Sequence, residues 1–295
     1  MDDRNRIFIG TAGWSYPDWA GIVYPKGLAK GPAQLRYLAD FVDCVEINNT
    51  FYRPPAVKAV RRWVDAVSGV EDFIFTVKLW RGFTHESGWT GEDVKAFREG
   101  IEPMREAGRL GAILVQYPWS FQNTQENRAV LHKLAAAFSG EPLVLEIRHV
   151  SWNTKSALDF IADNNCSFAN IDQPESKTGV TGTEIITGPV GYVRMHGRNS
   201  AAWFDADSGR DEKYNYLYSS KELNWWVERV KKISSKVGAT FIIMNNHFQG
   251  KALANSIQIA ALLGQKVRIP DSLIYQYPEL KKIDRVDSGQ RGLFG

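Results

Sequence analysis

The sequence predicts a (β/α)8 TIM barrel that forms a single domain over residues 1–295. Eight short apolar segments with strand character mostly alternate with helical segments, and this alternation is typical of parallel strand pairing. The chain is also just longer than the ~250 residues of a typical barrel. The other candidate, an open doubly wound sheet, usually carries G-x-G-x-x-G after its first strand. Here that position reads Gly10-Thr-Ala-Gly-Trp-Ser15, so the fingerprint is missing.

The predicted strands are apolar runs, and the second one shows the pattern best. Val45 and Ile47 alternate with Cys44, Glu46 and Asn48, as expected where successive side chains point to opposite faces of a strand. The eight strands are expected, in order, over residues 6–14, 43–48, 73–78, 112–116, 143–148, 167–172, 191–196 and 240–245.

Helices are expected between most of these strands, and three of them carry a start signal. Pro54-Pro55 suits a first helical turn, Thr90 is a plausible N-cap, and Asn153 or Thr154 begins another helix. The predicted helices cover residues 32–41, 54–67, 91–107, 125–138, 153–164, 221–236 and 251–263.

Three other segments lack a helical period. Residues 173–188 contain Gly, Thr and Pro, so the sixth crossover is expected to be irregular. Residues 197–220 form the longest expected loop, and the tail from Gln265 is expected to wrap over the surface.

Composition narrows the class of protein. The net charge is +3, from 36 basic and 33 acidic residues, which is too mild to indicate a nucleic-acid or membrane-surface protein. No apolar run is long enough for a membrane span, and the N-terminus lacks the apolar core of a signal peptide. Cys44 and Cys166 form no disulfide framework and are expected to be buried thiols, so we expect a cytoplasmic protein.

Polar residues end seven of the eight predicted strands, where a barrel of this type carries its active site. Within each strand the two-residue period places them on one face. Burying so many polar groups is costly unless they are paired or functional. The residues are Glu46 and Asn48, Lys78, Gln116, Glu146 and Arg148, Asn170 and Asp172, Arg194 and His196, and Asn245 or Asn246.

The acids and bases of this set balance, so its charges are expected to pair with one another. Glu46 with Lys78 and Glu146 with Arg148 therefore have a plainer interpretation, as structural ion pairs that plug the barrel top. Aromatic residues are frequent in the same loops, where they either line a ligand pocket or only pack against other side chains. They are Trp14, Phe51, Tyr52, Trp80, Tyr117, Trp119, Trp152 and Trp203.

These motifs together resemble the YecE-like family, the domain of unknown function numbered seventy-two. The resemblance rests on Gly10-Thr-Ala-Gly-Trp-Ser-Tyr16, Val45-Glu-Ile-Asn-Asn-Thr-Phe-Tyr-Arg53, Phe75-Thr-Val-Lys78, Gln116-Tyr-Pro118, Glu146-Ile-Arg-His149 with Trp152, Arg194-Met-His-Gly197 and Asn245-Asn246. It extends from the first strand to the last helix and implies a TIM-type barrel. It implies no established activity.

The leading hypothesis is an enzyme that acts on a small anionic or hydroxyl-rich ligand by acid/base chemistry, and the candidate enzyme class is a hydrolase. No metal or cofactor is expected, and the oligomeric state is left open. The candidate catalytic residues are Glu46, Lys78, Glu146 and His196. The candidate ligand-binding residues are Trp14, Asn48, Tyr52, Gln116, Arg148, His149, Trp152, Asp172, Arg194, Asn245 and Asn246.

Two alternatives stay open. Glu46, Glu146, Asp172 and His196 are ligand types for a divalent ion, as in a metal-dependent phosphoesterase that acts on nucleic acid. No short His/Glu/Asp spacing motif is present and nearby Lys and Arg residues would repel such a cation, so this alternative ranks second, and nucleic acid is not the favoured partner. The other alternative is a barrel that binds a ligand without turning it over.

Overall fold

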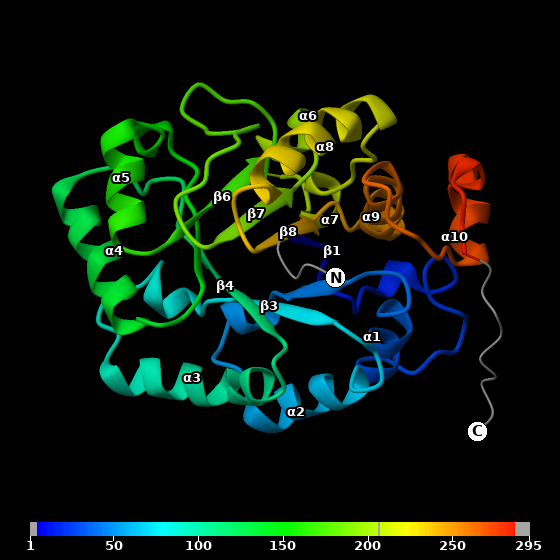
Figure 1. Ribbon diagram of the computed structural model, residues 1–295, viewed down its shortest axis with the longest axis horizontal. Coiled ribbons are helices and arrows are strands. Elements are labelled where there is room, and N and C mark those ends of the chain that lie inside the picture. The colour runs from blue at the N-terminus through cyan, green and yellow to red at the C-terminus, as the bar shows by residue number, and fades with distance from the viewer. Residues whose placement is uncertain (1–4, 206, 287–295) are drawn as a thin grey trace.

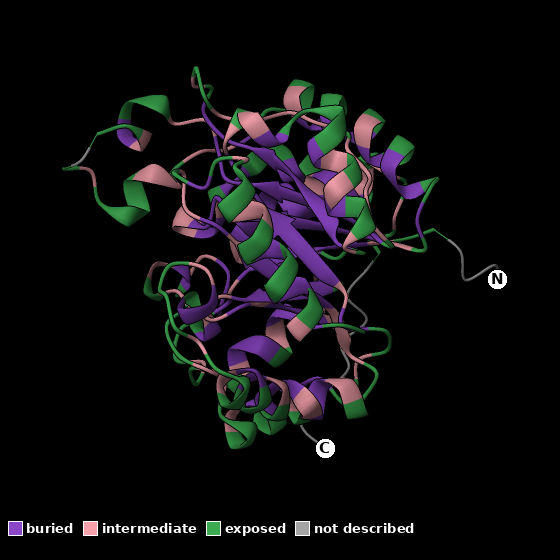
Figure 2. Ribbon diagram, turned by 90° about the vertical axis from the view of Figure 1, so that its left-hand side faces the viewer, coloured by how far each residue is buried: buried purple, intermediate pink, exposed green. Residues whose placement is uncertain are grey.

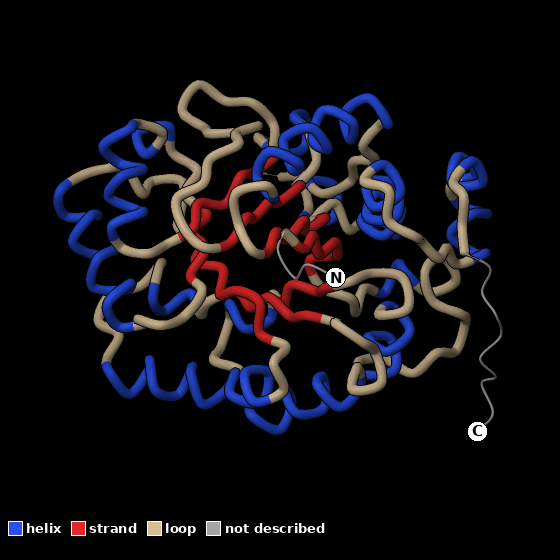
Figure 3. Tube along the Cα trace, in the orientation of Figure 1, coloured by secondary structure: helices blue, strands red, loops and turns tan. Residues whose placement is uncertain are grey.

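A computed structural model describes residues 5–205 and 207–286. Its eight strands pair in parallel and in sequence order, and β8 returns to β1 to close a barrel. Figure 3 shows the strands gathered at the centre with the helices around them. The (β/α)8 prediction is therefore confirmed. The strands are β1 Arg6–Ala12, β2 Cys44–Ile47, β3 Ile74–Lys78, β4 Leu110–Gln116, β5 Leu143–Glu146, β6 Ser167–Asp172, β7 Val190–Met195 and β8 Ala239–Met244.

Every crossover except the one from β6 to β7 carries a helix of at least seven residues. Figure 1 shows these helices arranged around the strands. The helices are α1 Pro32–Leu38, α2 Val57–Ala66, α3 Gly91–Glu106, α4 Gln125–Ala137, α5 Lys155–Asp163, α6 Ser200–Trp203, α7 Arg210–Lys213, α8 Ser220–Ser234, α9 Lys251–Leu262 and α10 Asp271–Gln276. Short 3-10 turns are η1 Pro17–Trp19, η2 Asn49–Phe51, η3 Arg81–Phe83, η4 Val150–Trp152, η5 Phe248–Gly250 and η6 Pro278–Lys282.

The helix starts agree with the sequence signals. Thr90 caps α3 reciprocally with Asp93, because each side chain accepts a hydrogen bond from the other residue's backbone N–H. Thr154, not Asn153, caps α5. Two segments are more ordered than expected. The long loop after β7 holds α6 and α7, and the tail beyond Gln265 holds α10 and buries Leu273 against the rest of the chain.

Two hydrophobic layers lie on either side of the strands, and Figure 2 shows the strands as the most buried part of the chain. The inner layer fills the barrel with residues such as Leu114 and Phe241. Close strand packing requires glycine at Gly10, because an added Cβ would lie 1.7 Å from the Cys44 carbonyl oxygen. Both cysteines are buried and free, as expected.

The first and last units of the barrel are joined by side chains as well as by strand pairing. The Trp19 indole donates to the His247 carbonyl at 2.7 Å, and the Asp18 carboxylate accepts from the Gln249 backbone N–H at 2.5 Å. Tyr277, after α10, donates to the Gln249 carbonyl at 2.6 Å. The tail thus braces the seam between β1 and β8.

In the part of the chain that the structure describes, no helix combines the length and the apolar character that crossing a bilayer requires.

Candidate functional site

The inner face of the barrel changes from apolar to polar toward the C-terminal ends of the strands. In β2, Cys44 lies in the apolar inner layer, and Glu46, two residues later, reaches the polar layer above it. Glu146 from β5 and Arg194 from β7 reach the same level and are also buried. The strand period therefore brings charges together from segments far apart in the sequence.

These charges form a closed network at the top of the barrel. Arg194 Nε and Nη2 donate to Glu46 at 2.8 and 2.5 Å, and Arg194 Nη1 donates to Glu146 at 2.7 Å. The Tyr192 hydroxyl also donates to Glu46 at 2.8 Å. Arg148 Nε and Nη2 both donate to Glu146 Oε1, at 2.8 and 2.5 Å. Two acids are thus neutralised by two arginines.

Arginine contacts determine the charge state of Glu146. Burial alone would raise its pKa, but Arg194 and then Arg148 hold the pKa of this carboxyl well below its usual range. Glu146 is therefore ionised at neutral pH.

His196 lies beneath the mouth, fully buried against Glu146 and Asn245. Its Nδ1 is 2.9 Å from Asn245 Nδ2, which donates to it, so Nε2 carries the proton of the neutral ring. That Nε2 lies 3.5 Å from Glu146 Oε1 and has no hydrogen-bond partner among the described residues. Burial lowers the pKa of His196 to about 4, although Glu146 opposes the shift. The ring is therefore neutral at pH 7.

Lys78, at the end of β3, is the ionisable group of the mouth that titrates near neutrality. Burial and then Arg194 lower its pKa to about 7, against the opposing effect of Glu146 and Glu46. Its Nζ lies 3.9 Å from the centre of the Phe51 ring. Among the described residues no carboxylate approaches within ion-pair distance of this amine.

A cavity of about 390 Å³ opens above the network, within the size range of small-ligand sites. Its lining includes eight of the predicted site residues, namely Trp14, Asn48, Tyr52, Lys78, Gln116, Arg148, Arg194 and Asn245. In the described chain the charged side chains of this lining are all cationic: Lys78, Arg148, Arg194 and Arg210. The neutral polar lining is rich in amides that can accept or donate hydrogen bonds.

Eight residues of the cavity lining were not among the predicted site residues, and four of them carry aromatic or charged groups that close one side of it: Tyr16, Arg210, Tyr214 and His247. Tyr16 and His247 stack face to face with ring centres 4.4 Å apart, and Tyr214 lies 5.2 Å from His247. Tyr16 follows the Gly10–Trp14 segment and His247 follows Asn246, so their neighbours in sequence were a signal. Tyr214 and Arg210 come from the long loop after β7, which carries no such signal.

The structure corrects the prediction that Asp172 is a ligand-binding residue, because its side chain does not face the mouth. In β6 the inward residues are Ala169 and Ile171, so Asp172 points out toward the helices. There it accepts hydrogen bonds from Arg198 at 2.9 and 2.6 Å, from the Tyr218 hydroxyl at 2.8 Å and from the Trp226 indole at 2.5 Å. Its role in the structure is to anchor α8 and the loop before it. Asn170, on the same outward face, binds the backbone of residues 185 and 192.

Three further predicted residues also lie outside the cavity. The Trp152 indole donates to the Phe121 carbonyl at 2.9 Å and packs in the outer layer. His149 accepts a hydrogen bond from the Ser151 backbone, since β5 has already ended at Glu146. Asn246 donates to Tyr216 and to Asn255, at 2.8 and 2.7 Å. Their contacts are structural.

Comparison with known proteins identifies the family. The family described as "Protein of unknown function DUF72" matches residues 8–278. This chain belongs to the DUF72 family. That assignment confirms the resemblance drawn from the strand-end motifs.

The similar proteins extend over nearly the whole chain. The UPF0759 protein YunF of Bacillus subtilis (strain 168) is 28% identical over 87% of this chain and 94% of its own length. A crystal structure of a DUF72 family protein from Thermotoga maritima MSB8 has a TM-score of 0.78 and 32% identity, covering 88% of this chain and all of its own. A DUF72 family protein from Enterococcus faecalis V583 also has a TM-score of 0.78, with 28% identity, 89% of this chain and 97% of its own. None of these names states an activity.

The metal-site alternative finds little support in this DUF72 protein. Within residues 5–205 and 207–286 no group of three or more His, Cys, Asp and Glu is placed to hold a metal ion. Of the four expected ligands, Asp172 faces outward, and Glu46 and Glu146 are bound by arginine. A cation at the mouth would also meet the guanidinium groups of Arg148 and Arg194.

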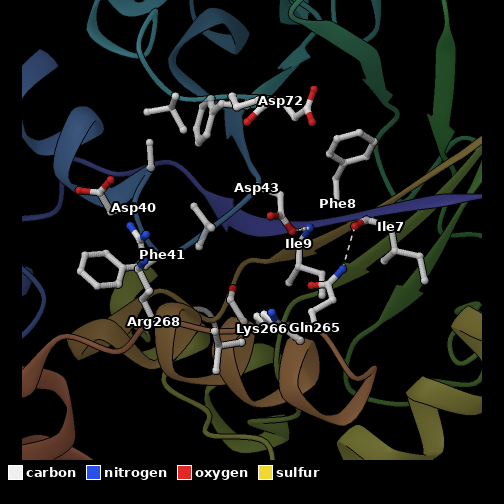
Figure 4. A pocket seen from close by; sticks show the side chains of 18 of the residues that line it. Ile7, Phe8, Ile9, Asp40, Phe41, Asp43, Asp72, Gln265, Lys266 and Arg268 are labelled. Atoms are coloured by element: carbon white, nitrogen blue, oxygen red, sulfur yellow. Dashed lines mark hydrogen bonds between the residues drawn. The ribbon is translucent and has the colours of Figure 1, made fainter. Parts of the chain in front are cut away.

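A second cavity, of about 450 Å³, lies at the opposite end of the barrel, around the start of β1 (Figure 4). Several of its polar groups already have partners. Asp43 accepts from the Ile9 backbone at 3.1 Å, Gln265 donates to the Ile7 carbonyl at 3.0 Å, and Arg6 pairs with Asp72 at 3.0 Å. The N-terminal face of such a barrel usually serves stability, so the mouth cavity remains the candidate site.

Proposed function

We propose that this DUF72 protein is an enzyme that acts on a small anionic ligand in the mouth cavity, with Lys78 as its acid/base group. The observation that carries the proposal is the positive charge of the cavity lining. Among the described residues, its charged groups are cations, while the nearby acids are bound by arginine below the cavity. A carboxylate or phosphate would balance this excess.

Arg148 is the best candidate to hold the anion. Its Nε and Nη2 are committed to Glu146, but no described residue accepts a hydrogen bond from Nη1. Arg148 is only 7% exposed, and the centres of the Trp119 and Trp203 rings lie 5.6 and 5.9 Å from its guanidinium carbon. Binding there would exclude water from a charge-assisted hydrogen bond, which strengthens it.

The amides add a second kind of recognition. Asn48 Oδ1 is buried at the cavity and has no hydrogen-bond partner within the described chain. A buried acceptor without a partner is costly, so a ligand hydroxyl or N–H would satisfy it. This supports a ligand that carries both an anionic group and a hydrogen-bond donor.

Lys78 is suited to proton transfer because a catalytic group works best when its pKa lies near the working pH. Its pKa of about 7 meets that condition, whereas His196 and Glu146 keep a single charge state there. We therefore propose that Glu46 and Glu146 position the arginines, that His196 stays neutral beside Glu146, and that Lys78 faces the ligand.

Anion binding tests the proposal. Isothermal titration with phosphate, pyruvate and small phosphorylated sugars is expected to detect at least one ligand, and Arg148→Gln should weaken it. The loss of one charge-assisted hydrogen bond corresponds to about 1.5–3 kcal/mol, or roughly tenfold to a hundredfold in affinity. Arg210→Gln should also weaken binding, and its exposed side chain leaves the buried network untouched.

Arg128→Gln is the matched control. Arg128 also lies beside an aromatic ring, 5.0 Å from the centre of Phe160, and its Nε donates to Asn123 at 2.7 Å, but it does not line the cavity. Its replacement should leave anion affinity unchanged. If Arg148→Gln and Arg210→Gln bind every anion as the unaltered protein does, the proposed function is wrong.

A further inference from the structure

The Lys78 amine has an unusual setting for a half-buried lysine. Such a lysine normally pairs with a carboxylate, yet here the neighbouring acids are occupied by Arg148 and Arg194. The Phe51 ring covers one face of the amine, with its centre 3.9 Å from Nζ, and Lys78 lines the mouth cavity. The amine is thus free to react with a molecule in that cavity.

We propose that Lys78 condenses with the carbonyl carbon of a small 2-oxo acid whose carboxylate is held by Arg148, forming an imine. This inference rests on the proposed function and specifies its substrate class. In a 2-oxo acid the carbonyl carbon is bonded directly to the carboxylate. A ligand anchored on one lining cation therefore presents its carbonyl to another within the same cavity of about 390 Å³.

Two features favour a nucleophilic amine at this position. Burial and the neighbouring Arg194 lower the pKa of Lys78 to about 7, so about half of the amine is unprotonated at neutral pH. Desolvation and an adjacent cation are the two means by which lysines are activated toward carbonyl substrates. Arg194 and Arg148 are such cations, and they are fixed by their glutamate partners.

The step balances without any oxidant or reductant. The amine lone pair forms a C–N bond, the carbonyl π pair moves to oxygen, and the nitrogen proton passes to that oxygen through solvent, giving a carbinolamine. A further proton from solvent converts the hydroxyl into water. The C–O bond then breaks as water leaves, and the nitrogen lone pair forms the iminium double bond. The amides of Asn48 and Gln116, which also line the cavity, can hydrogen-bond the departing oxygen.

Reductive trapping tests the inference. The full-length protein is incubated at pH 7 with pyruvate or glyoxylate and sodium cyanoborohydride, then digested and analysed by mass spectrometry. With pyruvate, the peptide that contains Lys78 should gain the mass of one pyruvic acid less one oxygen atom. Lys133 is the internal control, because its Nζ also lies over an aromatic ring, 4.3 Å from the Trp89 centre, but outside the cavity. Labelling of Lys78 should exceed that of Lys133 by about tenfold or more.

Lys78→Arg keeps the charge and removes the nucleophile, so it should abolish the adduct while pyruvate or glyoxylate still binds. Titration calorimetry on the same proteins separates the two proposals. If the oxo acids bind through Arg148 but Lys78 is labelled no more than Lys133 by either, the imine is refuted and the proposed function stands. If no anion binds at all, the proposed function fails, and the inference fails with it.

Discussion

Replacing Glu146 by Gln tests the buried charge network directly. The Gln side chain keeps the shape of Glu but carries no charge, and its amide N–H groups would face donors. In the native protein Glu146 accepts from Arg148 Nε at 2.8 Å and from Arg194 Nη1 at 2.7 Å, with His196 Nε2 at 3.5 Å. The substitution leaves two buried guanidinium groups with too little negative charge.

The size of the expected stability loss follows from the burial of Glu146 and its two arginine partners. Removing one member of a buried ion pair costs about 3–5 kcal/mol, because the remaining charge stays buried and uncompensated. Glu146 and Arg194 are 0% and 2% exposed in their side chains, so solvent does not screen the loss. We expect Glu146→Gln to lower the free energy of unfolding by about 4 kcal/mol.

Urea denaturation followed by circular dichroism measures this change. Glu228→Gln is the control, since Glu228 pairs with Lys231 at 3.0 Å but both side chains are more than half exposed. Such a surface pair contributes about 0.5 kcal/mol or less. If Glu146→Gln costs no more than Glu228→Gln, the network does not have the burial and pairing described here.

Acid provides a second check on the same variant. The folded-state pKa of Glu146 lies well below its ordinary value of 4.5, so its stabilising contribution is present above pH 4.5. That contribution is lost as the pH falls through the folded-state pKa. The stability gap between the native protein and Glu146→Gln should therefore narrow below pH 4.5. A gap that stays constant on acidification would contradict the ionised state of Glu146.

Three further predictions concern other parts of the molecule. Lys78→Met should be more stable than the native protein at pH 7, because the folded state penalises the charged amine. The difference should fade as the pH rises from about 7 to 10.5, and urea titrations at both ends check it. Asp172→Asn should lower the free energy of unfolding by about 3 kcal/mol in the same assay, yet leave anion affinity within about twofold, since Asp172 faces α8. A large loss of anion affinity would show that Asp172 contributes to the site after all. Gly10→Ala should yield no folded protein, because its Cβ would overlap the Cys44 carbonyl; native near-ultraviolet dichroism from this variant would disprove that.

The barrel was predictable because each strand and most helices carry their own signal in the sequence. The site was predictable where strand period and barrel interior coincide, as for Glu46, Lys78 and Arg194. Asp172 shows the limit of that reasoning. Both faces of a parallel barrel strand are buried, so alternation tells which residues share a face but not which face is inside.

In β6 the inward residues are the apolar ones. Asp172 is stable on the outer face because Arg198 and Trp226 donate hydrogen bonds to it there. Those partners come from a distant loop and from α8, and nothing in β6 itself indicates them. Arg210 was missed for a similar reason, because only the folding of the long loop after β7 brings it to the cavity.

The seam between β1 and β8 has a consequence for how this chain is made. During synthesis from the N-terminus, β1 emerges first, but one of its edges has no partner until residues 239–244 leave the ribosome. The hydrogen bonds of Trp19 and Asp18 also form only after His247 and Gln249 have been synthesised. Because such long-range contacts close late and slowly, most of the chain is synthesised while an open strand edge is exposed to aggregation or chaperone binding.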